Sequence, residues 1–175
     1  LGAGKTTFIK RLARNVDQRF AILENEYGAA GIDGARLGQN RQGTQKNVWE
    51  MTEQCICCIG KKDFAASVLT IANVVDPEYL IVEPTGVGSL ARIIENLRQI
   101  EYERIQLLSP VTIVDVYSYR RYMAEYPELY QDQIRSADTI IVSKTEACQA
   151  EEKQRIQKFL QEINSQAKII TDYAS

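Results

Sequence analysis

The first residues of the chain have the types and spacing of a phosphate-binding loop. They match the visible part of the pattern G-x-x-x-x-G-K-[ST], whose opening glycine would fall just before Leu1. Glycines let backbone N–H groups curl around phosphate oxygens, the lysine supplies positive charge to the β and γ phosphates, and the threonine hydroxyl binds Mg²⁺. The alternative is a glycine-rich turn with a surface lysine. The predicted nucleotide-binding residues here are Gly2, Ala3, Gly4, Lys5, Thr6 and Thr7.

An acidic residue follows the apolar run Tyr79 to Val82. Glu83 stands where a P-loop enzyme places the carboxylate that binds Mg²⁺ through water or orients the attacking water. Gly86 comes three residues later and would let a backbone N–H reach the γ-phosphate. We therefore predict catalytic roles for Lys5 and Glu83; a helix-capping carboxylate is the alternative for Glu83.

Three of the four cysteines lie within four positions. Cys55, Cys57 and Cys58 offer three thiolates, a soft site suited to Zn²⁺ or Cu(I) with an open fourth position. The chain contains no histidine, so any other metal ligand here is a carboxylate or water. The alternative is cysteines that pack under the sheet. Cys148 is remote from the cluster and is expected to be a buried apolar residue.

A fourth motif, Ser-Lys-Thr-Glu, occupies residues 143–146, where guanine-specific enzymes carry Asn-Lys-x-Asp. Lys144 would pack its stem over the base, and the Glu146 carboxylate can accept the two hydrogen bonds that an aspartate accepts from guanine. Ser143 lacks the amide of asparagine. Guanine and adenine therefore both remain open at this stage.

Short apolar runs alternate with helical periodicity throughout the chain. Because strands without in/out alternation, each followed by a helix, indicate a parallel sheet covered on both faces, we predict a three-layer α/β P-loop fold. Pro127 is expected to break the tyrosine-rich helical stretch from 117 to 134. Strands are predicted at 19–23, 47–52, 79–82, 111–114, 139–142 and 168–170, and helices after Thr6 and at 62–75, 90–97 and 151–163.

The length of 175 residues fits one domain, predicted here over residues 1–175. A P-loop sheet needs a central strand before its first glycine, so we expect the sequence to be a fragment that lacks this strand. The net charge of -2 argues against nucleic acid and anionic membranes as main partners. Clustered cysteines fit a disulfide framework poorly, which favours reduced thiols and a cytoplasmic protein.

These motifs, in this order along one chain, resemble the CobW-type metallochaperone GTPases, relatives of the hydrogenase and urease nickel-insertion GTPases. The resemblance implies that GTP and Mg²⁺ bind at the P-loop and that residues 24–28 and 83–86 are the first and second switches. It also implies that the three clustered cysteines, with Glu24 as an oxygen ligand, bind the transported metal. Zinc is favoured by the thiolates, with cobalt or nickel as alternatives. The implied partner is a client metalloprotein, and a homodimer is one candidate assembly. The resemblance also implies a carboxyl-terminal domain that the sequence lacks.

Two other functions are compatible with the same residues. A P-loop kinase with a structural metal site would need an arginine-rich lid, for which Arg120 and Arg121 are the only obvious pair in the second half. A non-hydrolysing nucleotide-binding scaffold would use an exposed tyrosine surface. Its residues would be Tyr117, Tyr119, Tyr122, Tyr126 and Tyr130.

Overall fold

The computed structural model describes residues 2–15, 18–24, 48–52, 61–84, 86 and 88–172. The chain divides into two compact units. Unit 1 contains Leu1–Lys5, Ser89–Arg98 and Gln106–Ser175, and unit 2 contains Thr6–Gly88 and Gln99–Ile105. Each unit has its own sheet. One domain over residues 1–175 stays a prediction.

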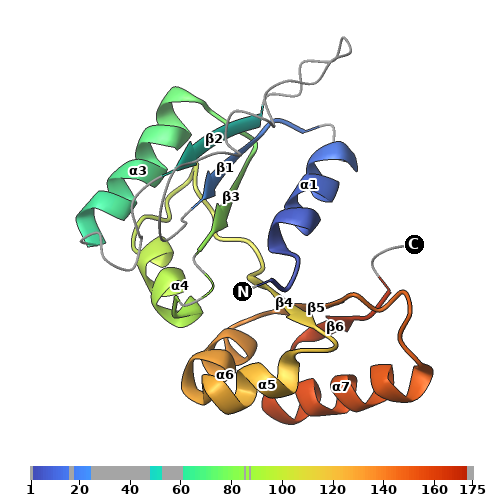
Figure 1. The fold of residues 1–175 in the computed structure, drawn as a ribbon. Helices are drawn as coiled ribbons and strands as arrows, with labels where there is room; N and C mark the ends of the chain where they lie inside the picture. Colours follow the sequence, from blue (N-terminus) through green and yellow to red (C-terminus); the bar gives the residue numbers. More distant parts are fainter. Residues whose placement is uncertain are drawn as a thin grey trace. The chain divides into compact units, whose positions relative to one another are not determined.

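Unit 2 is built on a parallel sheet of three strands in the order β2-β1-β3. In β1, the consecutive residues Ala21, Ile22 and Leu23 are all buried. Since neighbouring side chains of a strand point to opposite faces, both faces of this strand are covered. Ile22 packs with Ile9 of helix α1, and Figure 1 shows α1 and α3 on opposite sides of the sheet. Both faces are therefore covered. The elements are α1 (Lys5–Asn15), β1 (Phe20–Glu24), β2 (Val48–Thr52), α3 (Lys61–Val74) and β3 (Tyr79–Glu83).

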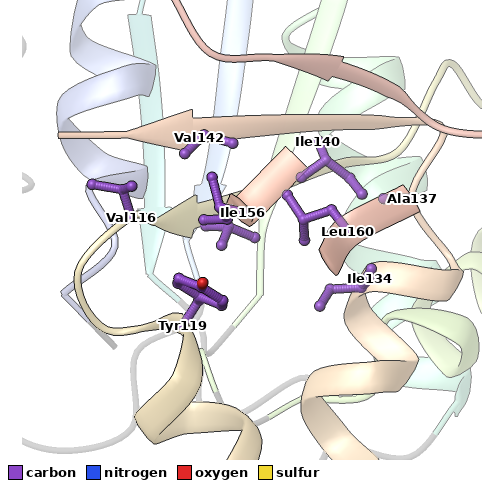
Figure 2. Packing of buried hydrophobic residues seen from close by; sticks show 9 residues of the cluster. Val116, Tyr119, Ile134, Ala137, Ile140, Val142, Ile156 and Leu160 are labelled. Carbon is purple, nitrogen blue, oxygen red and sulfur yellow. The ribbon is translucent and has the colours of Figure 1, made fainter. Parts of the chain in front are cut away.

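Unit 1 contains a second parallel sheet of three strands, in the order β4-β5-β6. Its main core lies between this sheet and the helices α5, α6 and α7, as Figure 2 shows for Ile140 and Val142 of β5 against Ile156 and Leu160 of α7. These four side chains are fully buried. The elements are α4 (Leu90–Arg98), β4 (Val111–Asp115), α5 (Tyr119–Glu125), α6 (Pro127–Arg135), β5 (Thr139–Ser143), α7 (Ala150–Ile163) and β6 (Lys168–Ile170).

The predicted elements agree with the structure to within about one residue at most boundaries, and a helix ends just before Pro127 as expected. All strand pairs among the described residues are parallel, which confirms the prediction of a parallel α/β fold. Among the described residues the strands form two parallel sheets of three, one in each unit.

No helix in the described ranges is long and apolar enough to span a bilayer.

Asn164, at the end of α7, joins three backbone segments of unit 1. Its Nδ2 donates to the carbonyls of Ile134 and Ala137, both at 2.9 Å, and its Oδ1 accepts from the backbone N–H groups of Gln166 and Ala167, both at 3.1 Å. Because several half-buried backbone groups would lose their partner at once, Asn164→Ala is expected to lower the free energy of unfolding by about 2 kcal/mol in urea titrations.

The matched control is Gln166→Ala, since within the described part of the chain the Gln166 side-chain amide bonds only to the hydroxyl of Ser165. This variant should unfold within about 0.5 kcal/mol of the wild type. Equal stabilities for the two variants would show that the Asn164 bonds contribute nothing.

Candidate functional site

The phosphate-loop residues have the backbone conformation that the motif requires. Gly2 and Gly4 have φ values of 71° and 95°, in the region that disfavours residues with a Cβ atom. Helix α1 begins directly after them at Lys5, and its first turn contains no acidic residue. Successive N–H groups in such a turn, followed by the positive end of a helix dipole, form an anion-binding concavity.

The loop is tied to the Ser-Lys-Thr-Glu motif inside unit 1. The Ser143 hydroxyl donates to the Ala3 carbonyl at 2.6 Å, and a Cβ atom at position 4 would lie 3.9 Å from the Ser143 Cβ. Ser143 is 1% exposed and ends β5. The serine that stands in place of asparagine thus contacts the phosphate loop from inside the protein.

Lys144, the next residue, is held by an aspartate that the sequence analysis did not select. Its Nζ lies 2.6 Å from Asp115 Oδ2, at the end of the neighbouring strand β4, where Asp115 and Ser143 are Cα partners. Burial alone would raise the pKa of the Asp115 carboxyl. The hydrogen bonds from Lys144 and from the Tyr117 backbone N–H outweigh burial and hold that pKa below its usual value. Asp115 is therefore ionised at neutral pH.

The remaining residues of the motif lie at the same end of the sheet. The Thr145 hydroxyl donates to the Thr171 carbonyl at 2.6 Å, just after β6, and Glu146 is exposed to solvent. Cys148 is half-buried and packs against the core of unit 1. The predicted base-recognition residues thus lie at the carboxyl end of β5, where their contacts come from the ends of β4 and β6, as is usual for ligand sites in open α/β sheets.

In unit 2, the strand register brings the predicted switch residues together at one edge. Glu24, the last residue of β1, is the Cα partner of Thr52 in β2 and of Glu83 in β3. All three stand at the carboxyl ends of parallel strands. Thr6, in the first turn of α1, and Gly86 belong to the same unit, and both are half-buried.

The residues present fit a magnesium ion in their donor chemistry. Mg²⁺ takes oxygen ligands and keeps several waters, and the Thr6 hydroxyl and the half-buried Glu83 carboxylate are oxygen donors of unit 2. Thr6 would bind the ion directly, and Glu83 through water. Lys5 and residues 2–4, by contrast, belong to unit 1 together with Ser143, Lys144 and Glu146.

The predicted transition-metal site lies outside the described residues. Cys55, Cys57 and Cys58 follow β2 within the undescribed range 53–60, and the side chain of Glu24 is likewise not described. Among the described residues, no three histidine, cysteine, aspartate or glutamate side chains form a group able to hold a metal ion. The cysteine ligands remain a prediction.

The features weighed for the alternative functions have ordinary surface contacts. Arg120 Nε donates to the Tyr119 hydroxyl at 2.9 Å, and Arg121 lies 5.0 Å from the centre of the Tyr122 ring. Both arginines are exposed, as on a solvated helix face. The five tyrosines do not share one exposed surface, because Tyr119 is only 3% exposed while Tyr117 is 63% exposed.

Sequence reasoning found the motifs but missed Asp115 and the contact between Ser143 and Ala3. One signal was present for Asp115: it is an acid directly after the apolar run 111–114, at the position in a strand where Glu83 was selected. Nothing local could reveal that Asp115 pairs with Lys144, because neighbouring strands are assigned only by the tertiary fold.

Comparison with known proteins gives a consistent result. The family described as CobW/HypB/UreG, nucleotide-binding domain, matches residues 1–171. The zinc chaperone YeiR of Escherichia coli is 30% identical over 97% of this chain and 52% of its own length. The zinc chaperone YjiA of the same organism is 27% identical over 98% of this chain and 54% of its own length. The chain thus spans about half the length of these relatives.

A zinc-regulated GTPase metalloprotein activator of Dictyostelium discoideum is 24% identical over 97% of this chain and 43% of its own length. Among solved structures, the Zn(II)-bound YjiA GTPase from E. coli superposes with a TM-score of 0.72 at 22% identity, covering all of this chain and 55% of that one. This likeness confirms the predicted P-loop α/β fold. Since the family match extends over nearly every residue of the sequence, the chain belongs to the CobW/HypB/UreG family and contains its nucleotide-binding domain.

Proposed function

We propose that this chain is the nucleotide-binding part of a GTPase that binds zinc at Cys55, Cys57 and Cys58 and delivers it to a client metalloprotein. The relatives named as zinc chaperones support the metal and its transfer. The reduced thiolates that such a site needs favour the cytoplasm. Three thiolates favour zinc over cobalt or nickel, and an open fourth position suits a metal that must be released.

The observation that carries the proposal is the register at the edge of the unit 2 sheet. Glu24 and Glu83, from the two predicted switches, end neighbouring strands as Cα partners, and β2 ends beside Glu24 at Thr52. Cys55 follows Thr52 by three residues. A change of either switch on hydrolysis can therefore be passed through the ends of these strands to the cysteines over a short length of chain.

The hydrolytic chemistry follows from the residues of the P-loop. Backbone N–H groups of residues 2–5 would bind phosphate oxygens, and Lys5 would stabilise the charge that develops between the β and γ phosphates. Glu83 would orient the attacking water. A bound Mg²⁺ would supply further positive charge to the phosphates. Guanine is proposed as the base because Glu146 is an exposed carboxylate beside Lys144 and can accept from its N1 and N2 groups.

Coupling requires that zinc bind with different affinity in the two nucleotide states, because a ligand with equal affinity for both shifts neither. We therefore expect competition titrations with a chromophoric chelator to give different zinc affinities with a GTP analogue and with GDP in the full-length protein. Cys57→Ser and Cys58→Ser should each weaken zinc binding by about 100-fold and remove the nucleotide dependence.

Cys148→Ser is the matched control, because Cys148 packs against the core of unit 1 and is remote from the cluster in sequence. It should leave zinc affinity unchanged. Equal zinc affinity with GTP analogue and GDP would contradict the coupling. If the protein binds nucleotide but no metal, the three clustered cysteines are packing residues. The protein would then be better explained as an unrelated P-loop phosphotransferase.

A further inference from the structure

The side chain of Lys144 is restrained although it is half exposed. Its Nζ lies 2.6 Å from Asp115 Oδ2, and the two side chains are 50% and 8% exposed, respectively. A free lysine stem samples many rotamers, and fixing its ammonium end removes much of that freedom. Half of the Lys144 side chain is therefore exposed while its ammonium end is held in one place.

Asp115 is fixed from two directions. Its Oδ1 accepts from the Tyr117 backbone N–H at 2.9 Å, while Oδ2 binds Lys144. The same strand end bonds to β5 through the backbone, where the Val116 N–H donates to the Ser143 carbonyl at 3.3 Å. Because the carboxylate is nearly buried and held at both oxygens, it is a rigid anchor for the lysine.

The backbone of Lys144 also has an unusual conformation. Its φ is 61°, in the left-handed region that a residue with a Cβ atom adopts only when the surrounding structure compensates. On one side Ser143 is tied to Ala3 of the phosphate loop, and on the other Thr145 is tied to Thr171. With these two bonds and the Asp115 pair, the backbone and the ammonium end of Lys144 are both held, and the stem between them is restrained.

We propose that Asp115 is a positioning residue for the nucleotide base: it holds the Lys144 stem as a preformed platform on which the purine stacks. This inference rests on the proposed binding of GTP at this motif. Asp115 does not touch the nucleotide. Its contribution is to reduce the freedom that Lys144 would otherwise lose on binding, which is the gain expected of a preorganised site.

This role predicts that loss of Asp115 weakens the contact with the base and leaves the contacts with the phosphates unchanged. Asp115→Asn removes the ion pair while an amide oxygen can still accept from the Tyr117 N–H. In calorimetric titrations of the full-length protein, this variant should bind GDP about five- to tenfold more weakly. Its affinity for inorganic tripolyphosphate, which has no base, should equal that of the wild type, and kcat for GTP should be unchanged while KM rises.

Lys144→Met is the second variant, because it keeps an aliphatic stem on a half-exposed side chain and removes the ammonium that binds Asp115. It should weaken GDP binding to the same extent, and the double variant Asp115→Asn with Lys144→Met should be no weaker than either single one. Asp138→Asn is the control: it neutralises an exposed aspartate of the same unit at the opposite end of β5, where Asp138 contacts Ser109. GDP binding should not change.

Additive losses in the double variant, or an equal loss of tripolyphosphate binding in Asp115→Asn, would overturn the positioning role. Wild-type GDP affinity in both single variants would also overturn it. These outcomes are distinct from failure of the proposed function, in which the wild type itself binds no GDP or GTP.

Discussion

Replacing Lys5 with alanine is expected to lower kcat/KM for GTP hydrolysis by about 1,000-fold, or about 4 kcal/mol of transition-state stabilisation. Lys5 begins α1 directly after Gly4, whose φ of 95° turns the chain into the helix. A cation at this point neutralises the charge shared by the β and γ phosphates as the bond between them breaks. Steady-state phosphate release measures the effect.

Lys10→Ala is the matched control for this experiment, since Lys10 belongs to the same helix and is more than one turn further along. It removes the same charge and should change kcat/KM less than about threefold, because its position is not at the phosphate loop. Hydrolysis by Lys5→Ala at the wild-type rate would show that residues 1–7 form only a glycine-rich turn.

The sequence was informative about the fold because the strands of a parallel sheet are buried on both faces. Such strands appear as unbroken apolar runs, and Ala21, Ile22 and Leu23 in β1 are all buried as that pattern requires. The helix boundary near residue 127 could be predicted equally well, since α5 ends just before Pro127 and α6 begins with it. Local chemistry decided these features, so they could be predicted without the tertiary structure.

The contacts that connect the candidate site could not be predicted in the same way. Lys144 and Asp115 are 29 residues apart, and Ser143 and Ala3 are 140 residues apart. Both pairs depend on how segments far apart in the sequence come together in the tertiary fold, and local sequence patterns do not encode that. A substitution such as serine for asparagine at 143 reads locally as the loss of a base contact, whereas its hydroxyl donates to the phosphate loop.

Replacing Glu83 with glutamine is expected to reduce kcat for GTP hydrolysis by about 100-fold while GDP affinity changes less than about threefold. Glutamine has the size of glutamate but cannot take up a proton or bind a magnesium-bound water as strongly. Glu83 ends β3 beside Glu24, so a defect here should also reach the metal site if the strand ends connect the switches. Single-turnover hydrolysis separates the chemical step from product release.

The strand itself supplies the control, because Glu78 lies just before β3, at the opposite end from Glu83. It pairs with Arg19 on the surface, with an N–O distance of 3.7 Å, and Glu78→Gln should hydrolyse GTP as the wild type does. If Glu83→Gln keeps its zinc affinity when GTP binds and changes it only as GTP is slowly hydrolysed, hydrolysis is what releases the metal. If zinc affinity changes as soon as GTP binds, the γ-phosphate contact alone is enough to change the metal site. Hydrolysis would then only restore the affinity of the GDP-bound state.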